Sequence, residues 1–373
     1  MHGSIISALG ARSMVGDTYT LLCFQDCCAA LRDAASFSSC VYDEKVGPAM
    51  GEIILGMDGP EHRKRRNLVA RAFRQSTLER WEDSLILPIC NELVDRFAGV
   101  GRADLVSDYA FEIPIRVISA ILGLPVEDLS QLRRWSSELI GVGADIGRAL
   151  GASAGLTEYF ARVVASKRKH PGDDVISDLA EADVDGEVLA DEVIYAFLRL
   201  LLSAGTETTF RSIGNMMYLL ASHPDQLARI ASKRALVAQA VEEALRVEPP
   251  VLFISRRATR DVRINGVTIP EGASVEVCLG SANHDEARWV DPDEFDILRP
   301  AKPHLAFGTG AHMCLGLHLA RMEMRVALNV LLERLDGLRL EPFGDEGDAR
   351  DPHIRGLVFR SPDALPVVFE RSE

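Results

Sequence analysis

The chain has 373 residues, of which 47% are hydrophobic and 26% charged, a balance typical of a globular protein and not of a disordered one. Its formal net charge of −14 makes binding to nucleic-acid phosphates or to an anionic membrane surface unfavourable. The sequence contains no apolar run of about 18 residues, and its first residues, MHGSIISALGARSM, lack a secretory pattern, so we expect a cytoplasmic protein without a membrane span.

Strand patterns are short and few. In chain order they cover 18–24, 261–270 and 273–280. Within the second, Asn265-Gly266 is typical of a tight hairpin turn. Polar loops are predicted at 170–174 and 341–352.

Most of the predicted structure is helical. Apolar residues recur at intervals of three and four in three segments, 78–99, 193–222 and 235–247. The middle segment is apolar on most faces up to Glu207, which predicts a buried helix that crosses the molecule. Because no repeat or linker divides the chain, we expect one mainly α domain over residues 1–373, with minor β-structure.

The seven cysteines form an odd set without the paired spacing of zinc ligands, and in a reducing compartment we expect them to remain thiols. Cys23, Cys27 and Cys28 cluster without a nearby histidine, so we interpret them as packing residues. Cys314 differs from them, because it lies between a glycine-rich stretch and a long predicted helix.

The segment that leads to Cys314 reads HLAFGTGAHMCLG. A helix N-terminus carries partial positive charge and free N–H groups, which lower the pKa of a thiol and stabilise its anion. Glycines let the backbone lie against a flat cofactor, and three are present, Gly308, Gly310 and Gly316. A buried packing cysteine is the alternative at such a position.

The pattern Phe307-Gly308-x-Gly310-x-His312-x-Cys314-x-Gly316 resembles the haem-binding loop of the cytochrome P450 superfamily, in its soluble bacterial type. The resemblance implies the P450 fold, with a long central helix over haem b and small β-sheets at one side. It also implies that Cys314 is the iron ligand and that Phe307, Gly308, His312 and Gly316 contact the haem. A thiolate ligand favours O–O cleavage, the chemistry of a monooxygenase.

The hexad Ala204-Gly205-Thr206-Glu207-Thr208-Thr209 places an acid and hydroxyls inside an apolar helix. Taken alone, such residues often bond back to the helix backbone or reach solvent. Beside the cysteine loop, the hexad resembles the oxygen-activation groove of the family. Glu207 would then deliver protons, Thr208 would donate a hydrogen bond to dioxygen, and Ala204 and Gly205 would leave room for it.

Glu243 and Arg246 are three residues apart on a predicted helix and share a face. Such a pair usually marks a solvated surface. Here it is similar to the family's Glu-x-x-Arg helix, and Arg299 matches the arginine that completes a structural triad. The implied role of this triad is to fix the segment that leads into the cysteine loop.

Haem propionates require cations at one edge of the group, and arginine suits carboxylates best. His62 and Arg66 lie one turn apart and resemble the family's His-x-x-x-Arg helix, while Arg256 resembles the arginine before the hairpin. Within the cluster 63–66, Arg63, Lys64 and Arg65 are interpreted as a solvated face.

The resemblance runs from about residue 18 to the C-terminus, but the segment before the first strand is shorter than the family's usual lead-in, so we expect a shortened N-terminal helix region. Positions that match distal-pocket contacts are mostly apolar: Leu200, Ser203, Ala204, Leu252, Ile254 and Phe359. They predict a hydrophobic substrate of the terpenoid, steroid, fatty acid or polyketide kind.

We expect a monomer that receives NAD(P)H electrons through a ferredoxin reductase and a ferredoxin. A basic patch is a hypothesis for ferredoxin docking, formed by Arg63, Arg65, Arg71, Arg74, Arg321 and Arg325. Two alternatives remain open, a peroxide-using haem-thiolate peroxygenase and a catalytically silent haem-binding partner protein.

Overall fold

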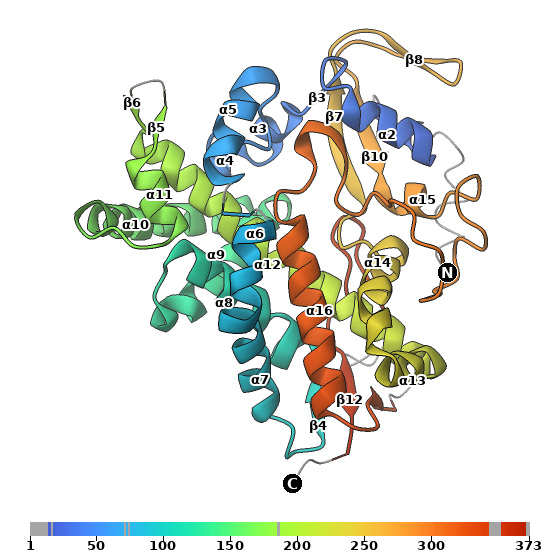
Figure 1. The fold of residues 1–373 in the computed structure, drawn as a ribbon. Helices are drawn as coiled ribbons and strands as arrows, with labels where there is room; N and C mark the ends of the chain where they lie inside the picture. The colour runs from blue at the N-terminus through green and yellow to red at the C-terminus, as the bar shows by residue number, and fades with distance from the viewer. Residues whose placement is uncertain are drawn as a thin grey trace. The chain divides into compact units, whose positions relative to one another are not determined.

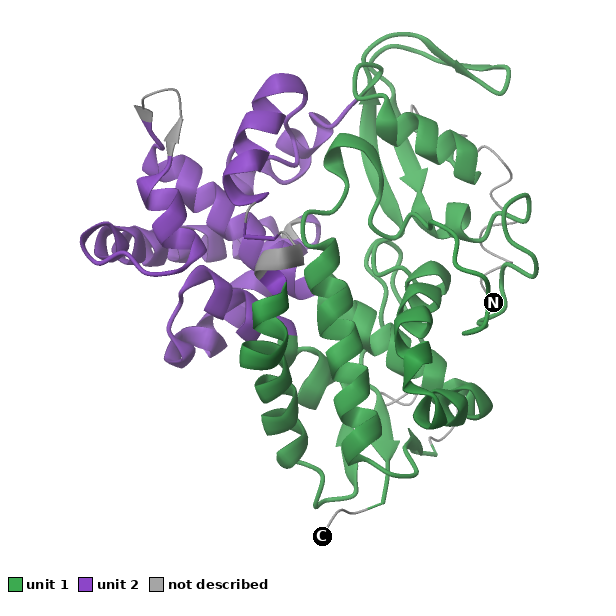
Figure 2. Cartoon of the chain, viewed as in Figure 1, with its two compact units in different colours: residues 1–37, 79–113, 208–373 green, residues 38–78, 114–207 purple. Residues whose placement is uncertain are grey.

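The computed structural model describes residues 14–15, 18–70, 72–73, 75–184, 187–342 and 352–370. The chain forms two compact units: residues 1–37, 79–113 and 208–373 make unit 1, and residues 38–78 and 114–207 make unit 2 (Figure 2). Most described residues are helical and the sheets are small, which confirms the prediction of a mainly α chain with minor β-structure. The single-domain assignment stays a prediction.

The largest sheet has the strand order β1-β2-β10-β7-β3. Its strands are β1 (Met14–Val15), β2 (Thr18–Leu21), β3 (Phe37–Ser38), β7 (Phe253–Ala258) and β10 (Ser274–Cys278). Strand β10 runs parallel to β2 and antiparallel to β7. Alternate residues of β10, Val275 and Val277, are fully buried in a core shared with Cys27, which agrees with our interpretation of that cysteine as a packing residue.

The strand predicted over 18–24 is shorter than expected. It ends at Leu21, because helix α2 (Phe24–Arg32) begins three residues later, and the backbone N–H of Phe24 donates to the Asp285 carboxylate at 2.7 Å. The predicted hairpin is confirmed as β8 (Val262–Ile264) and β9 (Val267–Ile269). Asn265 and Gly266 have φ values of 47° and 79°, as a two-residue hairpin turn requires.

The helix predicted over 78–99 is interrupted. It consists of α6 (Gln75–Trp81), a π-helical turn η1 (Glu82–Ile86) and α7 (Leu87–Asp95). Pro88 lies in the first turn of α7. Proline lacks an N–H and its ring clashes with the carbonyl four residues earlier, so the helix opens by one residue just before it.

Helix α16 (Leu317–Arg334) forms the centre of the helical part of unit 1, where it packs against α7 and α14 (Val237–Val247) (Figure 1). The buried Tyr109 hydroxyl donates to the Ala327 carbonyl at 3.0 Å. This bond connects the π-helical turn that contains Tyr109 to α16. The helix predicted over 235–247 is confirmed as α14 preceded by a 3₁₀ turn. The other elements of unit 1 are η2 (Val106–Ala110), α13 (Pro224–Ser232), η5 (Arg234–Leu236), α15 (Leu279–Asn283), η6 (Gly310–His312) and a sheet of order β11-β12-β4 (Arg339–Leu340, Pro366–Val368 and Arg102–Asp104).

Unit 2 is built around α10 (Ile146–Lys169), which packs against α9 (Leu129–Ile140), α11 (Val175–Glu181) and α4 (Gly47–Met50). Asp145 caps α10 by accepting a hydrogen bond from the Arg148 N–H at 3.0 Å. The remaining elements are α3 (Val41–Lys45), α5 (Gly59–Ala70), α8 (Glu112–Leu122), η3 (Val126–Asp128), η4 (Gly141–Gly143), β5 (Asp183–Val184) and β6 (Glu187–Val188).

Helix α12 (Asp191–Ser222) is the long helix predicted over 193–222, and it belongs to unit 2 up to Glu207 and to unit 1 from Thr208. Most of its residues are buried, as predicted. Among the described helices, none has the length and apolar character that a membrane crossing would require. The loop predicted at 341–352 lies mostly outside the described residues.

Candidate active site

The cysteine loop of unit 1 is an ordered bend that ends at the N-terminus of α16. The Cys314 N–H donates to the Phe307 carbonyl at 2.9 Å, which closes the loop on itself. Its beginning is fixed by the Leu305 N–H, which donates to the Asn283 side-chain oxygen at 2.7 Å. Gly316 is the N-cap of α16, so Cys314 lies three residues before the first residue, Leu317, of an 18-residue helix.

This arrangement fits a thiolate that binds a metal. The first turn of α16 has N–H groups without helical acceptors and the positive end of the helix dipole, and both stabilise an anionic sulfur. The Cys314 side chain is half-buried and therefore accessible. Gly310 has φ 78°, and a Cβ there would lie 2.4 Å from the Leu31 carbonyl oxygen, so only glycine allows the loop to pack against α2.

Behind the loop, Phe307 is held by a charged cluster that sequence reasoning missed in part. The Arg321 guanidinium lies 4.5 Å from the centre of the Phe307 ring. Arg321 also donates two hydrogen bonds, of 2.6 and 2.8 Å, to the Glu242 carboxylate, and His304 Nε2 lies 3.3 Å from the same carboxylate. Burial tends to raise the pKa of Glu242, but the hydrogen bonds from His304 and Arg321 outweigh it and lower that pKa to about 2.

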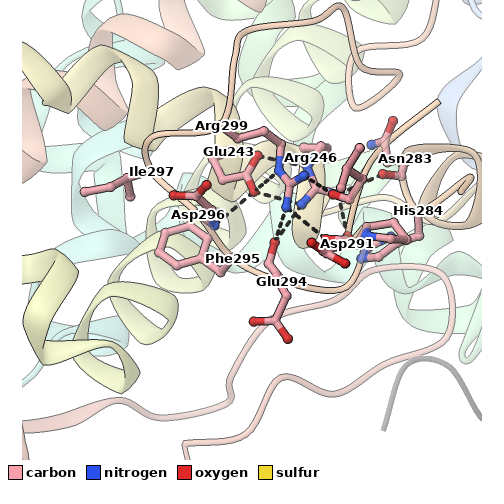
Figure 3. A network of polar contacts seen from close by, with 12 residues as sticks. Glu243, Arg246, Asn283, His284, Asp291, Glu294, Phe295, Asp296, Ile297 and Arg299 are labelled. Carbon is pink, nitrogen blue, oxygen red and sulfur yellow. Dashed lines mark hydrogen bonds and ion pairs between the residues drawn. The ribbon is translucent and has the colours of Figure 1, made fainter.

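Glu243, Arg246 and Arg299 meet in unit 1, as Figure 3 shows. Arg246 donates two hydrogen bonds of 2.8 Å to Glu243, and Arg299 donates a third of 2.9 Å to the same carboxylate. Arg246 is only 1% exposed and Glu243 5%, so this is a buried network and not a solvated helix face.

The triad also holds backbone carbonyls of the segment before the cysteine loop. Arg246 donates to the Pro292 and Glu294 carbonyls at 2.6 and 2.9 Å, and Arg299 donates to the carbonyls of Val290, Asp291 and Glu294. Carbonyls in an irregular loop need donors when water is excluded, and two guanidinium groups supply them here. The triad therefore fixes the course of residues 290–294.

The distal hexad lies on α12, and its exposure changes along the helix. Ala204 is exposed and Gly205 and Thr208 are half-buried, whereas Thr206, Glu207 and Thr209 are buried. Residues separated by three or four positions share a helix face, so Ala204, Gly205 and Thr208 mark one accessible side of α12 at this point. In unit 2, Gly205 packs against Ile118, whose Cγ1 would lie 3.0 Å from a Cβ.

Glu207 has a partner that the sequence did not reveal. The Ser137 hydroxyl of α9 donates a hydrogen bond of 3.0 Å to its carboxylate, within unit 2. Neither residue type nor spacing in the sequence signals this contact, because the two residues are 70 positions apart.

The predicted propionate residues fall in different units. In unit 2, His62 is buried and Arg66 half-buried on α5. In unit 1, Arg256 is 3% exposed on β7 and donates to the Ser255 carbonyl at 2.8 Å, while His312 is half-buried in η6.

Three of the predicted pocket residues lie near one another in unit 1. Ile254 Cδ1 would lie 3.5 Å from a Cβ on Gly308, which places β7 next to the cysteine loop. Leu252 donates its N–H to the Val358 carbonyl at 2.9 Å, and the adjacent Val251 pairs with Phe359. In unit 2, the buried Ser203 hydroxyl donates to the Arg199 carbonyl, and Leu200 is half-buried beside it on α12.

The hypothesis of a basic docking patch receives little support from the described residues. Arg321 pairs with Glu242, Arg325 with Glu82 at 2.6 Å, and Arg65 with Glu61 at 2.6 Å. These carboxylates offset the positive charge that would attract an acidic partner. Of the remaining members, Arg63 is exposed, and Arg71 and Arg74 lie outside the described residues.

Comparison with known proteins gives one consistent family. The family model described as "Cytochrome P450" matches residues 153–363. Cytochrome P450 107B1 of Saccharopolyspora erythraea is 40% identical over 86% of this chain and 78% of its own length, and the cytochrome P450 monooxygenase PikC of Streptomyces venezuelae is 40% identical over 87% and 77%.

A solved structure extends the likeness to almost the whole chain. The crystal structure of P450BioI in complex with an acyl carrier protein that carries hexadec-9Z-enoic acid has a TM-score of 0.89 and 32% identity. It covers 99% of this chain and 98% of its own. With the cysteine loop, the buried Glu-x-x-Arg network and these relatives taken together, the chain belongs to the cytochrome P450 family and is a haem-dependent monooxygenase.

Proposed function

We propose that Cys314 is the thiolate ligand of haem b in this monooxygenase and that the chain oxidises a hydrophobic small molecule. The observation that carries the proposal is the position of Cys314, half-buried at the mouth of α16 in a closed, glycine-containing loop. Haem held by a thiolate supplies the activation of dioxygen, because sulfur donates electron density and favours cleavage of the O–O bond.

The residues of unit 1 around the cysteine loop would hold the haem on the side of the thiolate ligand. Gly310 packs against Leu31 of α2, and Gly308 lies next to Ile254 of β7. Arg321 holds the Phe307 ring in place. His312 and Arg256, with His62 and Arg66 of unit 2, are proposed partners of the two propionates. Arginine and histidine donors are suited to this task because they form charge-assisted hydrogen bonds with carboxylates.

Glu207 and Thr208 are proposed to move protons to dioxygen on the side of the haem opposite the thiolate. Glu207 is buried and oriented by the Ser137 hydroxyl, so its carboxylate has a defined position from which to pass a proton. Thr208 is half-buried on the accessible side of α12, where its hydroxyl can donate to a bound small molecule. Ala204 and Gly205 on that side have no bulky side chain to fill the space.

The proposed substrate is apolar, of the terpenoid, steroid, fatty acid or polyketide kind. Leu252, Ile254 and Phe359 are half-buried apolar residues of unit 1, and Ile254 lies next to Gly308 of the cysteine loop. Binding is favoured when an apolar ligand removes half-buried apolar side chains from water. The fatty acyl group named in the P450BioI structure supports a long apolar skeleton.

Electrons are proposed to come from NAD(P)H through a reductase and a ferredoxin, as is typical of bacterial members of the family. We further propose a single functional domain, acting as a monomer in the cytoplasm. Turnover with reduced ferredoxin and NAD(P)H would support this route. Turnover with peroxide alone would instead identify a peroxygenase, and haem binding without any turnover would identify a silent binding protein.

The decisive experiment is the ferrous–CO difference spectrum of the purified full-length protein. Thiolate ligation gives a characteristic red-shifted Soret band, and Cys314→Ser should abolish that band. Cys40→Ser is the matched control, because Cys40 is a half-buried cysteine of unit 2 and should leave the spectrum unchanged. Protein that carries no haem, or a Cys314→Ser variant with the wild-type spectrum, would overturn the proposal.

A further inference from the structure

Arg199 on α12 is a buried cation in unit 2. Its side chain is 5% exposed, although arginine is among the residues least often buried without a partner. Burial lowers the pKa of its guanidinium, which nevertheless remains charged at neutral pH. Burying a charge is unfavourable unless a counter-charge offsets it, because the ion loses its hydration.

The contacts of Arg199 satisfy only part of this group. Nε donates to the Met50 carbonyl at 3.1 Å, and Nη1 donates to the Thr157 hydroxyl at 2.5 Å. Both acceptors are neutral, and among the described residues no carboxylate forms an ion pair with Arg199 and no acceptor binds Nη2. The acid whose charge influences it, Glu192, lies two turns earlier on α12 and is exposed.

Gly51 lies next to the third guanidinium nitrogen, Nη2. Nη2 lies 2.9 Å from the position that a Cβ on Gly51 would occupy, so any other residue there would press against the guanidinium. Two apolar residues, Met50 and Ala196, are buried beside it. The result is a cationic donor set next to apolar side chains, in which Nη2 is left for an acceptor from outside the described chain.

A purely structural role accounts for less of this geometry. Arg199 does tie the end of α4 to α10, but a neutral side chain could link these two acceptors without the cost of burying a charge. If Arg199 only linked these two acceptors, neither its positive charge nor its Nη2 group would be needed. A carboxylate would use both, because it accepts charge-assisted hydrogen bonds from a guanidinium.

We propose that Arg199 binds the carboxylate of the substrate, so that this enzyme selects hydrophobic acids over the corresponding neutral compounds. The inference rests on the proposed monooxygenase function and narrows its substrate class. Glu207 follows Arg199 by eight residues on the same helix, or about 12 Å along its axis. The oxidised carbon should therefore lie far from the carboxyl group.

The test compares acids with alcohols of the same skeleton in the haem-loaded, full-length protein. The probes are dodecanoic acid with dodecan-1-ol, and dehydroabietic acid with dehydroabietinol, titrated by calorimetry at neutral pH, where the acids are ionised. In at least one pair, the acid should bind about tenfold or more tightly than the alcohol, the size expected for hydrogen bonds to a charged group.

Three variants separate the proposed role from a structural one. Arg199→Met should remove the preference for the acid while leaving alcohol binding within about twofold, and Arg199→Lys should keep part of the preference because it keeps the charge. Arg162→Met is the control, since Arg162 is an exposed arginine of α10 that pairs with Glu158 at the surface. It should leave every affinity unchanged.

Absence of an acid preference in both pairs, including absence of any binding, would overturn the inference. Equal weakening of acid and alcohol by Arg199→Met would assign Arg199 a structural role and overturn it as well. Should Arg199→Met not fold, Arg199→Lys and the wild-type preference still decide the question. The ferrous–CO spectrum distinguishes this failure from that of the proposed function, because a normal spectrum without acid preference rejects only the role of Arg199.

Discussion

Ser137 on α9 donates a hydrogen bond of 3.0 Å to Glu207 on α12, and the acceptor is the buried carboxylate of the distal hexad. A buried carboxylate without fixed donors would adopt several orientations or lose its charge. The serine hydroxyl therefore gives Glu207 one preferred orientation. This contact links helix α9 to the residue that we propose delivers protons.

Replacing Ser137 with alanine should impair proton delivery without preventing folding. We expect Ser137→Ala to lower the fraction of consumed NAD(P)H that appears as oxidised product, by about two- to tenfold, the range expected for one hydrogen bond. The measurement is product formed per NAD(P)H consumed, together with the solvent deuterium isotope effect on turnover. Ser130→Ala, at an exposed position of the same helix, should behave as wild type. An unchanged coupling ratio and isotope effect in Ser137→Ala would show that the contact is incidental.

Removing Arg246 should destabilise unit 1 strongly. Arg246→Ala leaves the buried Glu243 carboxylate without its bidentate partner and removes the guanidinium donor from the Asn283 and Pro292 carbonyls. The Glu294 carbonyl keeps only the hydrogen bond from Arg299 among the two that the guanidinium groups supply. Breaking a buried ion pair on one side costs about 3–5 kcal/mol. Urea unfolding should show this loss, and haem content after purification should fall. Arg229→Ala removes an exposed arginine of α13 and should change neither quantity. A loss below about 1 kcal/mol would contradict a central role of the triad.

The pKa of Glu242, lowered to about 2 from its usual 4.5, makes stability depend on pH in a defined direction. Between these values, the unfolded chain binds a proton that the folded chain does not, so stability rises with pH. The stabilisation by Arg321 and His304 is complete above about pH 4.5 and is lost as pH falls toward 2. Glu242→Gln should flatten this part of the stability curve measured by denaturant unfolding. Glu271→Gln, at an exposed position, should retain the wild-type slope.

The pKa of Glu323 on α16 is shifted in the opposite direction, so its effect on the pH dependence of stability is opposite to that of Glu242. Glu323 is 1% exposed, its Oε2 has no hydrogen-bond partner among the described residues, and burial raises its pKa well above 4.5. The folded chain then keeps a proton that the unfolded chain releases, so stability falls as pH rises above about 4.5. Glu323→Gln removes this dependence and should gain stability over wild type with increasing pH, by at most about 1.4 kcal/mol per unit. Glu333→Gln, at an exposed position of the same helix, is the control. Parallel curves for Glu323→Gln and wild type would refute the prediction.

The sequence by itself determined the family and the parts of the site that depend on neighbours along the chain. The cysteine loop could be predicted because its glycines, Cys314 and the start of α16 lie within a dozen residues of one another. The long helix α12 and the hairpin at Asn265-Gly266 were predictable for the same reason, since periodicity and turn residues are local signals. The break before Pro88 was missed, although its cause is also local.

Only the tertiary structure decided which distant residues complete these local motifs. Ser137 meets Glu207 across 70 positions, and Glu242 meets Arg321 across 79. It also showed that Arg199 is a buried cation next to Gly51, where periodicity had predicted only part of an apolar helix. Local patterns fix backbone conformation over a few turns, whereas burial and charge pairing depend on which segments pack together. A single sequence does not specify that packing through spacing or composition, because each side chain's surroundings come from segments far along the chain.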